Sequence, residues 1–140
     1  MGPTVGSSVA MRHVLLIEDN PADVLLVREA MRSAPIAADV WIAYDGEQAL
    51  RLLGECHPDL IILDLNLPKV GGLEVLEKHA GVESPVLVFT GSDNPIDRAR
   101  AMALGAREYI TKPMSWDEFM QVIRGAIERW MPTLLGSDAG

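Results

Sequence analysis

Polar side chains come directly after several short apolar runs of this sequence, at the positions where strands would end. They comprise three carboxylates, one hydroxyl and one ammonium group: Glu18, Asp19, Asp64, Thr90 and Lys112. The carboxyl ends of parallel strands lie along one edge of an open sheet, and ligands bind at that edge. We therefore expect these five side chains to converge.

Three carboxylates that converge need a compensating charge. Two like charges about 4 Å apart repel by roughly 4 kcal/mol at an effective dielectric constant of about 20. A divalent cation removes this repulsion, and carboxylate oxygens are ligands that suit Mg²⁺. Lys112 adds a positive charge for an anion, and Thr90 adds a hydroxyl donor. The group predicts a phosphoryl site with Mg²⁺ and an aspartate as the nucleophile.

Five apolar runs have the length of strands. They span residues 14–17, 39–43, 60–63, 86–89 and 108–110. Most of them lack the alternation of polar and apolar residues that a half-exposed strand shows. Such runs are typical of strands that helices cover on both faces.

Helix start signals separate these runs. The signals are Asn-Pro pairs and capping-box spacings. They occur at Asn20-Pro21, Asn94-Pro95, Asp45 with Gln48, and Ser115 with Glu118. A further helix is expected to start near Gly71-Gly72. The order of strand then helix, repeated five times, predicts an α/β fold: a doubly wound five-stranded parallel sheet with helices on both faces.

Composition excludes several classes of protein. The chain has 140 residues, which is room for one domain. Its 20 acidic residues against 12 lysines and arginines give a net charge of −8, which opposes direct binding to nucleic acid or an anionic membrane. No apolar run approaches the roughly 20 residues that cross a bilayer. The single cysteine, Cys56, permits no internal disulfide, so we expect a cytoplasmic protein.

Five short motifs together carry a family resemblance. In chain order they are Glu18-Asp19, Asp64-Leu65-Asn66-Leu67-Pro68-Lys69, Gly71-Gly72, Thr90-Gly91 and Lys112-Pro113. In order and spacing they resemble the receiver domain of two-component response regulators, over about residues 12–130. The resemblance implies the flavodoxin-like strand order 2-1-3-4-5. It also implies a phosphoacceptor signalling protein rather than an enzyme.

The resemblance assigns the acidic residues to two roles. Asp64 resembles the phosphoacceptor, which takes a phosphoryl group from a histidine kinase. Glu18 and Asp19 resemble the acidic pair that binds Mg²⁺ together with Asp64 and the backbone carbonyl of Asn66.

The resemblance also implies how the site responds to phosphorylation. Lys112 is similar to the lysine that pairs with the phosphoryl oxygens, and its peptide bond to Pro113 is expected to be cis. Thr90 resembles the switch hydroxyl, and Tyr109 resembles the aromatic residue that rotates with it. Gly71-Gly72 stands where the family usually has Asp-Gly, and we expect this change to loosen the loop after the phosphoacceptor.

We expect a receiver domain over residues 12–131, a disordered N-terminal tail over 1–11 and a C-terminal tail over 132–140. The motifs most resemble stand-alone receivers found beside phytochrome-type histidine kinases. Without an output domain, the signal is expected to leave by protein contacts or by homodimerisation through the face of residues 94–130. Four apolar residues near the C-terminus are expected to cover a partner or a second copy: Trp130, Met131, Leu134 and Leu135.

Two other functions remain open from the sequence. A degenerate receiver would act as a docking module without phosphorylation, and the intact acids, Thr90 and Lys112 count against it. An aspartyl-phosphate phosphatase would need a second acid in a D-x-D motif, but position 66 is Asn. The histidines are dispersed and show no metal-ligand spacing: His13, His57 and His79.

Overall fold

Five strands and five helices alternate along the residues that the computed structural model describes, which are 12–34, 38–79 and 84–131. The strands are β1 (Arg12–Ile17), β2 (Ala38–Ala43), β3 (Leu60–Leu63), β4 (Val86–Thr90) and β5 (Glu108–Thr111). The helices are α1 (Pro21–Ser33), α2 (Gly46–Glu55), α3 (Gly72–Lys78), α4 (Pro95–Ala103) and α5 (Trp116–Trp130). The tails expected at 1–11 and 132–140 lie outside the described residues.

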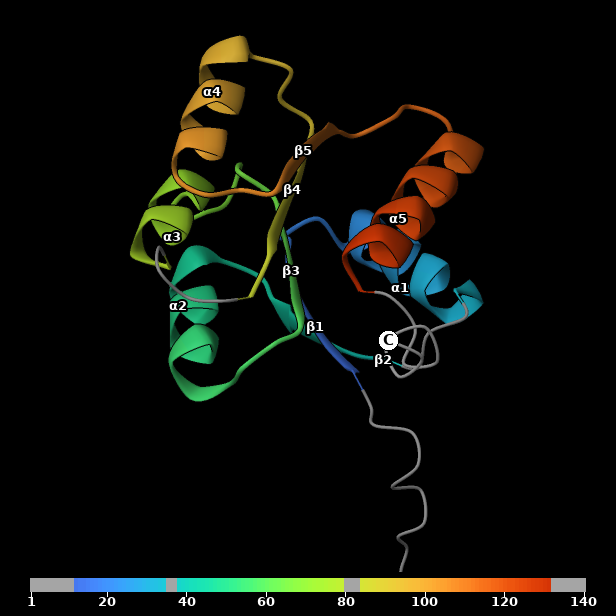
Figure 1. Ribbon diagram of the computed structural model, residues 1–140, viewed down its shortest axis with the longest axis horizontal. Coiled ribbons are helices and arrows are strands. Elements are labelled where there is room, and N and C mark those ends of the chain that lie inside the picture. The colour runs from blue at the N-terminus through green and yellow to red at the C-terminus, as the bar shows by residue number, and fades with distance from the viewer. Residues whose placement is uncertain (1–11, 35–37, 80–83, 132–140) are drawn as a thin grey trace, which may run out of the picture.

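The strands form one parallel sheet in the order β2-β1-β3-β4-β5. Helices α1 and α5 cover one face of the sheet, and α2, α3 and α4 cover the other (Figure 1). This is the predicted flavodoxin-like α/β architecture, which is confirmed. Since all strands run in one direction, their carboxyl ends share one edge, which is the upper edge in Figure 1.

Each strand contributes to two separate cores because successive side chains point to opposite faces of the sheet. On β1, Val14 and Leu16 enter the core beneath α1 and α5, whereas Leu15 and Ile17 enter the core beneath the other three helices. Every residue of β3 and β4 is buried. Burial on both faces explains why these strands read as continuous apolar runs.

The predicted helix starts are confirmed by their caps. Oδ1 of Asn20 accepts a hydrogen bond from Ala22 N at 2.9 Å, and Oδ1 of Asn94 accepts one from Ile96 N at 2.8 Å. Side chains also cap α2 and α5, at Asp45 and Ser115. These caps fix the first turn of each helix close to the carboxyl edge of the sheet.

The end of α5 differs from the sequence-based expectation. Met131 is buried in the core shared with α1, and the indole N–H of Trp130 donates to Glu108 Oε1 at 2.7 Å. The expectation of covering a partner is therefore wrong for the buried Met131. It stays a prediction for Trp130, which is half-buried, and Leu134 and Leu135 lie outside the described residues. Among the described residues, no helix combines the length and apolar character needed to span a bilayer.

The loop after β3 is clamped against the start of α2. Gly46 N donates to Pro68 O at 3.4 Å, and a Cβ at position 46 would overlap the backbone of this loop. Lys69 lies in the left-handed region with φ of 69°, and its ammonium is 3.6 Å from Asp45 and 3.7 Å from Glu47. This packing does not agree with the loosened loop expected from Gly71-Gly72.

The two glycines at the start of α3 have different roles. A Cβ at Gly72 would lie 2.5 Å from Leu65 Cα and 2.6 Å from Asp64 O, so only glycine fits there. Gly71 is the N-cap, has ordinary dihedral angles (φ −70°, ψ 161°) and provides no side-chain cap, and its Cβ would meet nothing within 4 Å.

Substitutions at these two glycines are therefore expected to act in opposite directions. Gly71→Ser should raise the free energy of unfolding by about 0.5–1 kcal/mol, because it adds a cap and restricts the unfolded chain. Gly72→Ala should lower it by about 1–3 kcal/mol through overpacking against the loop. Urea denaturation of both variants measures the two changes, and equal effects would contradict the assigned close approach at Gly72.

Candidate functional site

Three carboxylates meet at the carboxyl edge of the sheet because β1 and β3 are neighbours in it. The register pairs Ile17 with Leu63, so the residues that follow them emerge side by side. Carboxylate oxygens of Glu18, Asp19 and Asp64 all lie within 4.8 Å of one another. Glu18 and Asp64 are buried, whereas Asp19 is exposed. The sequence-based expectation that the three acids converge is met by this geometry.

Lys112 enters the same pocket from the end of β5. Its backbone N–H donates to Thr90 O at 2.7 Å, which continues the pairing of β5 with β4. Its ammonium donates to Glu18 Oε1 at 2.7 Å, to Asp23 Oδ2 at 2.7 Å and to Asp64 Oδ2 at 3.0 Å. The side chain of Lys112 is only 14% exposed, so these are partly buried, charge-assisted bonds.

Asp23 is the member of this pocket that the sequence analysis missed. It lies in the first turn of α1, where an acid is expected simply because the helix N-terminus favours negative charge. Its contact with Lys112 spans 89 positions of sequence. A usable signal was its place in the first turn of the helix that directly follows the acidic pair, since this turn begins at the same edge of the sheet.

The peptide bond between Lys112 and Pro113 is trans, as are the other peptide bonds of the described residues. The expectation of a cis bond at this position is wrong for this structure. The trans form is intrinsically favoured by about 0.5–1 kcal/mol before proline, and with this isomer the Lys112 side chain already reaches the three carboxylates.

The charges of the pocket divide unequally. Burial raises the pKa of Glu18 to about 7, and the charge of Asp64 adds to this effect while Lys112 opposes it. Burial also disfavours ionised Asp64, but the hydrogen bond from Asn66 N, the charge of Lys112 and the Thr90 hydroxyl hold the pKa of Asp64 below its ordinary value. Asp64 is therefore the more acidic of the two buried carboxyl groups.

Lys112 is fully charged despite its burial. Desolvation disfavours the ammonium, but the bonds to Asp23 and Glu18, with the charges of Glu18 and Asp64, raise the pKa of Lys112 above its usual range. One positive charge then faces four nearby carboxylates, those of the three clustered acids and Asp23. This excess of negative oxygen ligands fits a hard divalent cation such as Mg²⁺.

Thr90 and Tyr109 lie on the adjacent strands β4 and β5. Thr90 is completely buried at the end of β4. Tyr109 is 5% exposed; its hydroxyl donates to Ser92 O at 2.8 Å, and the guanidinium of Arg98 lies 5.0 Å from its ring centroid. These contacts join β5 to the loop that precedes α4 and to α4 itself. The switching role of the two residues stays a prediction.

Asn66 is connected to the phosphoacceptor candidate through its backbone. Its N–H donates to Asp64 Oδ1 at 3.0 Å, and its side chain is exposed. The bond fixes the rotation of the Asp64 carboxylate, whose other oxygen, Oδ2, contacts Lys112. The metal-binding role of the Asn66 carbonyl stays a prediction.

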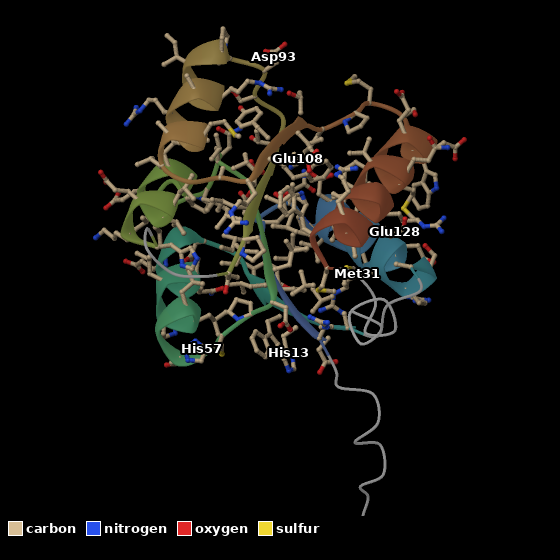
Figure 2. All side chains as sticks on the ribbon, in the orientation of Figure 1. His13, Met31, His57, Asp93, Glu108 and Glu128 are labelled. Carbon is tan, nitrogen blue, oxygen red and sulfur yellow. The ribbon has the colours of Figure 1, made fainter. Side chains whose placement is uncertain are left out.

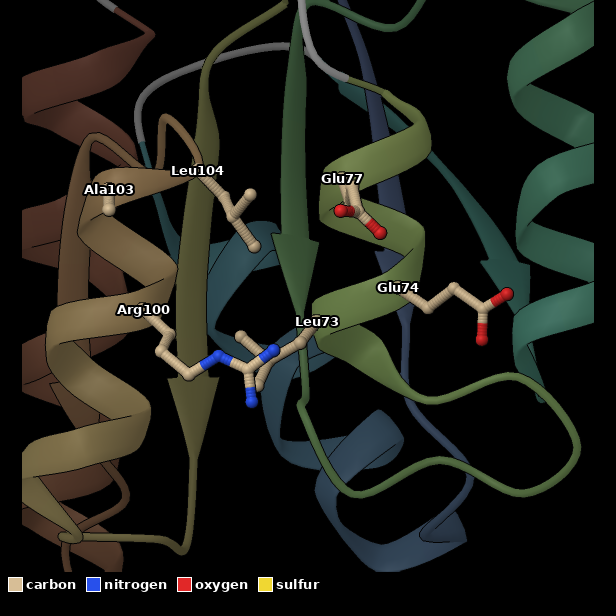
Figure 3. Close-up of a pocket in the computed structure, with 6 residues that line it drawn as sticks. All are labelled: Leu73, Glu74, Glu77, Arg100, Ala103 and Leu104. Carbon is tan, nitrogen blue, oxygen red and sulfur yellow. The ribbon is translucent and has the colours of Figure 1, made fainter.

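Other groups of possible chemical interest lie away from this pocket. Figure 2 shows His13 and His57 at the lower end of the sheet, whereas Asp93, which follows β4, lies at the upper end. A groove of about 360 Å³ between α3 and α4 has Arg100 extending toward Leu73 (Figure 3). None of the predicted site residues lines that groove.

Comparison with known proteins gives consistent results. Residues 14–124 match the family described as Response regulator receiver domain. Transcriptional regulatory protein TrcR of Mycobacterium tuberculosis is 37% identical over 119 residues, which are 84% of this chain. The chain spans only 46% of the length of that relative.

Solved structures of response regulators superpose well on this chain. The Mn²⁺-bound form of response regulator Rcp1 has 32% identity and a TM-score of 0.82, with 87% of this chain and 96% of that chain covered. The phosphorylated cyanobacterial phytochrome response regulator RcpA has 34% identity and a TM-score of 0.81, with 88% and 96% covered. The bacteriophytochrome response regulator AtBRR has 34% identity and a TM-score of 0.65, with 82% and 91% covered.

Proposed function

Because this chain belongs to the response regulator receiver domain family, we propose that it accepts a phosphoryl group on Asp64 from a histidine kinase, in a reaction that requires Mg²⁺. The observation that carries this proposal is the convergence on Asp64. An ionised, buried carboxylate lies 3.0 Å from a charged lysine and within 4.8 Å of two further carboxylates.

The residues present fit a divalent cation. Glu18, Asp19 and Asp64 would supply carboxylate oxygens, and the carbonyl of Asn66 would supply a neutral oxygen. When bound, Mg²⁺ neutralises negative charge on the phosphoryl oxygens and on the pocket. The Mn²⁺-bound relative supports this assignment, since Mn²⁺ also favours oxygen ligands.

Phosphoryl transfer then follows from the state of Asp64. A carboxylate oxygen of Asp64 forms a new bond to phosphorus as the bond from phosphorus to the donor nitrogen of the kinase histidine breaks. The bonding electrons leave with the imidazole. The Lys112 ammonium stabilises charge on the transferring group, and the N–H of Asn66 holds the carboxylate in one orientation.

The signal is proposed to leave through β4, β5 and α4. Phosphorylation adds about −1.5 to −2 charges and three acceptor oxygens beside Thr90 and Lys112. Tyr109 connects this site to Ser92 and Arg98, at the start of α4. A movement of Thr90 toward the phosphoryl group would disturb these contacts and alter protein binding or dimerisation through the face of residues 94–130.

The donor is proposed to be a histidine kinase of the phytochrome type. The support is the similarity to RcpA and AtBRR, whose names describe them as phytochrome and bacteriophytochrome response regulators. This chain spans less than half the length of its relative TrcR, so its output and its partners beyond the kinase are also proposals.

The proposal is tested by incubating the protein with acetyl phosphate, with Mg²⁺ or with a chelator. We expect the mass of one added phosphoryl group, alkali-labile, only when Mg²⁺ is present. Absence of labelling under both conditions would contradict the proposal and favour a docking module. Continuous release of phosphate from many unrelated phosphomonoesters would instead favour the phosphatase.

A kinase must reach the carboxyl edge of the sheet, and exposed apolar side chains flank that edge. Leu25 on α1 and Trp116 at the start of α5 are 68% and 59% exposed, and both line a groove of about 670 Å³ between these helices. Met114, just before α5, is fully exposed. Such anchors contribute most when a partner buries them.

Leu25→Arg and Trp116→Ala are therefore expected to slow phosphoryl transfer from a histidine kinase by about tenfold or more. Labelling by acetyl phosphate should be unchanged, because neither residue contacts Asp64. Ile96→Ala on α4 is the matched control, since Ile96 is also 67% exposed. Equal slowing in the Ile96 variant would place the kinase on another face.

A further inference from the structure

The Lys112 ammonium is held by more carboxylates than the phosphoryl chemistry requires. An ammonium has three N–H donors, and here they reach three elements: the end of β1 at Glu18, the first turn of α1 at Asp23 and the end of β3 at Asp64. The donor capacity of Lys112 is therefore fully used. Any new acceptor at this ammonium must replace one of the three carboxylates.

The three partners of Lys112 are not equivalent. Glu18 and Asp64 belong to the cluster whose oxygens lie within 4.8 Å of one another and fit a cation, whereas Asp23 does not belong to it. A cation in the cluster competes with Lys112 for Glu18, and a phosphoryl group on Asp64 changes the acceptor at that position. Of the three partners of Lys112, only Asp23 neither belongs to the cation cluster nor carries the phosphoryl group.

The backbone fixes Asp23 in place independently of the cluster. The Asn20 cap accepts hydrogen bonds from Ala22 N and from Asp23 N, at 2.9 and 3.4 Å, which sets the first turn of α1. A carboxylate in this turn is stabilised by the helix N-terminus. The side chain of Asp23 is 19% exposed, so its bond to Lys112 is only partly screened by solvent.

We propose that Asp23 is a positioning residue: it retains the Lys112 ammonium beside Asp64 while Glu18 and Asp64 engage the cation and the phosphoryl group. This inference rests on the proposed function. Two N–H donors of Lys112 then become available to phosphoryl oxygens while the third stays on Asp23. The long, flexible lysine side chain is thereby held in the orientation that pairs with the phosphoryl group.

The test uses beryllofluoride, an analogue of the phosphoryl group, at saturating Mg²⁺, with binding followed by the amide NMR signals of Thr90 and Lys112. Asp23→Ala removes the acceptor and should weaken beryllofluoride binding about tenfold, the value of one hydrogen bond to a charged group. Asp23→Asn keeps an acceptor oxygen and loses the charge, so its affinity should equal or exceed that of the parent. Mg²⁺ affinity should change by less than about threefold in both variants, because Asp23 lies outside the cation cluster.

The beryllofluoride affinities of the two Asp23 variants distinguish a positioning role from a simple effect of charge and from a loss of folding. Loss of a negative charge alone would strengthen binding of an anion in both variants, so an Asp23→Ala variant that binds as tightly as the parent overturns the inference. Thermal melting of the variants reports folding separately. Asp64→Asn, which should bind no beryllofluoride, tests the proposed function in the same experiment.

A second measurement does not depend on beryllofluoride. Exchange of the Lys112 ammonium protons with water, measured by NMR at saturating Mg²⁺, should be at least about tenfold faster in Asp23→Ala than in the parent. Unchanged exchange would overturn the inference even if the protein were never phosphorylated. Failure of the parent to bind beryllofluoride, with the expected exchange difference, would overturn only the proposed function.

Discussion

Asp64→Asn is expected to abolish labelling by acetyl phosphate in the presence of Mg²⁺, whereas the parent gains one phosphoryl group. The amide has nearly the shape of the carboxylate but lacks its charge and its nucleophilic oxygen. It also removes the negative charge of one of the three carboxylates proposed to hold Mg²⁺, so metal affinity should fall as well. Intact mass and release of phosphate by alkali measure the change.

The loss of labelling in Asp64→Asn should not arise from unfolding. The substitution removes the charge of Asp64, which contributes to the raised pKa of Glu18. The electrostatic repulsion between these two side chains is therefore lost. Urea denaturation without Mg²⁺ should show a stability similar to that of the parent. A large loss of stability would mean that the hydrogen bond between Asn66 N and Asp64 has a greater structural role than its 3.0 Å length suggests.

Asp93→Asn is the matched control for Asp64→Asn. Asp93 is exposed and follows β4 at the same edge of the sheet (Figure 2), but it does not belong to the acidic cluster. The Asp93→Asn variant should be labelled by acetyl phosphate to the same extent as the parent. Equal labelling of the parent and Asp64→Asn would refute the assignment of Asp64, whereas loss of labelling in both variants would indicate a general effect of charge at this edge.

Lys112→Ala is expected to lower the free energy of unfolding by about 3–5 kcal/mol without Mg²⁺. It leaves buried carboxylates without the cationic side chain that they contact in the described part of the chain. Glu18 and Asp64 are 3% and 6% exposed at their side chains, so water cannot replace the lysine well. Adding Mg²⁺ should recover much of this loss. Urea denaturation with and without Mg²⁺ measures both effects.

Lys112→Ala should also separate phosphorylation of Asp64 from the conformational response that follows it. Lys112→Ala retains Asp64 and the metal ligands, so some labelling by acetyl phosphate should remain. The conformational response should be lost, because the phosphoryl group no longer has the ammonium that connects it to β5. Unchanged phosphate-dependent partner binding or dimerisation in Lys112→Ala would refute this role.

Lys69→Ala is the control for the loss of a lysine. Lys69 also contacts two acids, Asp45 and Glu47, but its side chain is 59% exposed. Exposed ion pairs contribute only about 0–1 kcal/mol, so its removal should have a small effect on stability that Mg²⁺ does not recover. An effect as large as that of Lys112→Ala would show that burial is not the cause of the difference.

Much of the fold and site could be predicted because the relevant signals are local. Continuous apolar runs predicted buried strands, and Asn20, Asn94 and Ser115 predicted helix starts by hydrogen bonds that span only a few residues. The carboxyl-edge rule then placed Glu18, Asp64 and Lys112 together without further information. The resemblance to a known family added the roles of these residues, which spacing alone does not provide.

The errors come from contacts that are distant in the sequence. Asp23 has an adequate local explanation as an acid at a helix start, and only the folded chain shows Lys112 beside it. Met131 is apolar and terminal in the domain, features shared by buried and partner-binding residues, and its burial against the core depends on how α5 packs against α1. The trans bond before Pro113 is a choice between two isomers of similar energy.

The clamped loop after β3 gives the pocket one stiff wall and one compliant wall. On the stiff side, Gly46 and Gly72 leave no space between the loop and its neighbours. On the compliant side, Gly91 has open space around its α-carbon, and the residues from Asp93 to Ile96 are exposed. If Asp64 is phosphorylated as proposed, we therefore expect the loop between β4 and α4 to move more than the tightly packed loop after β3.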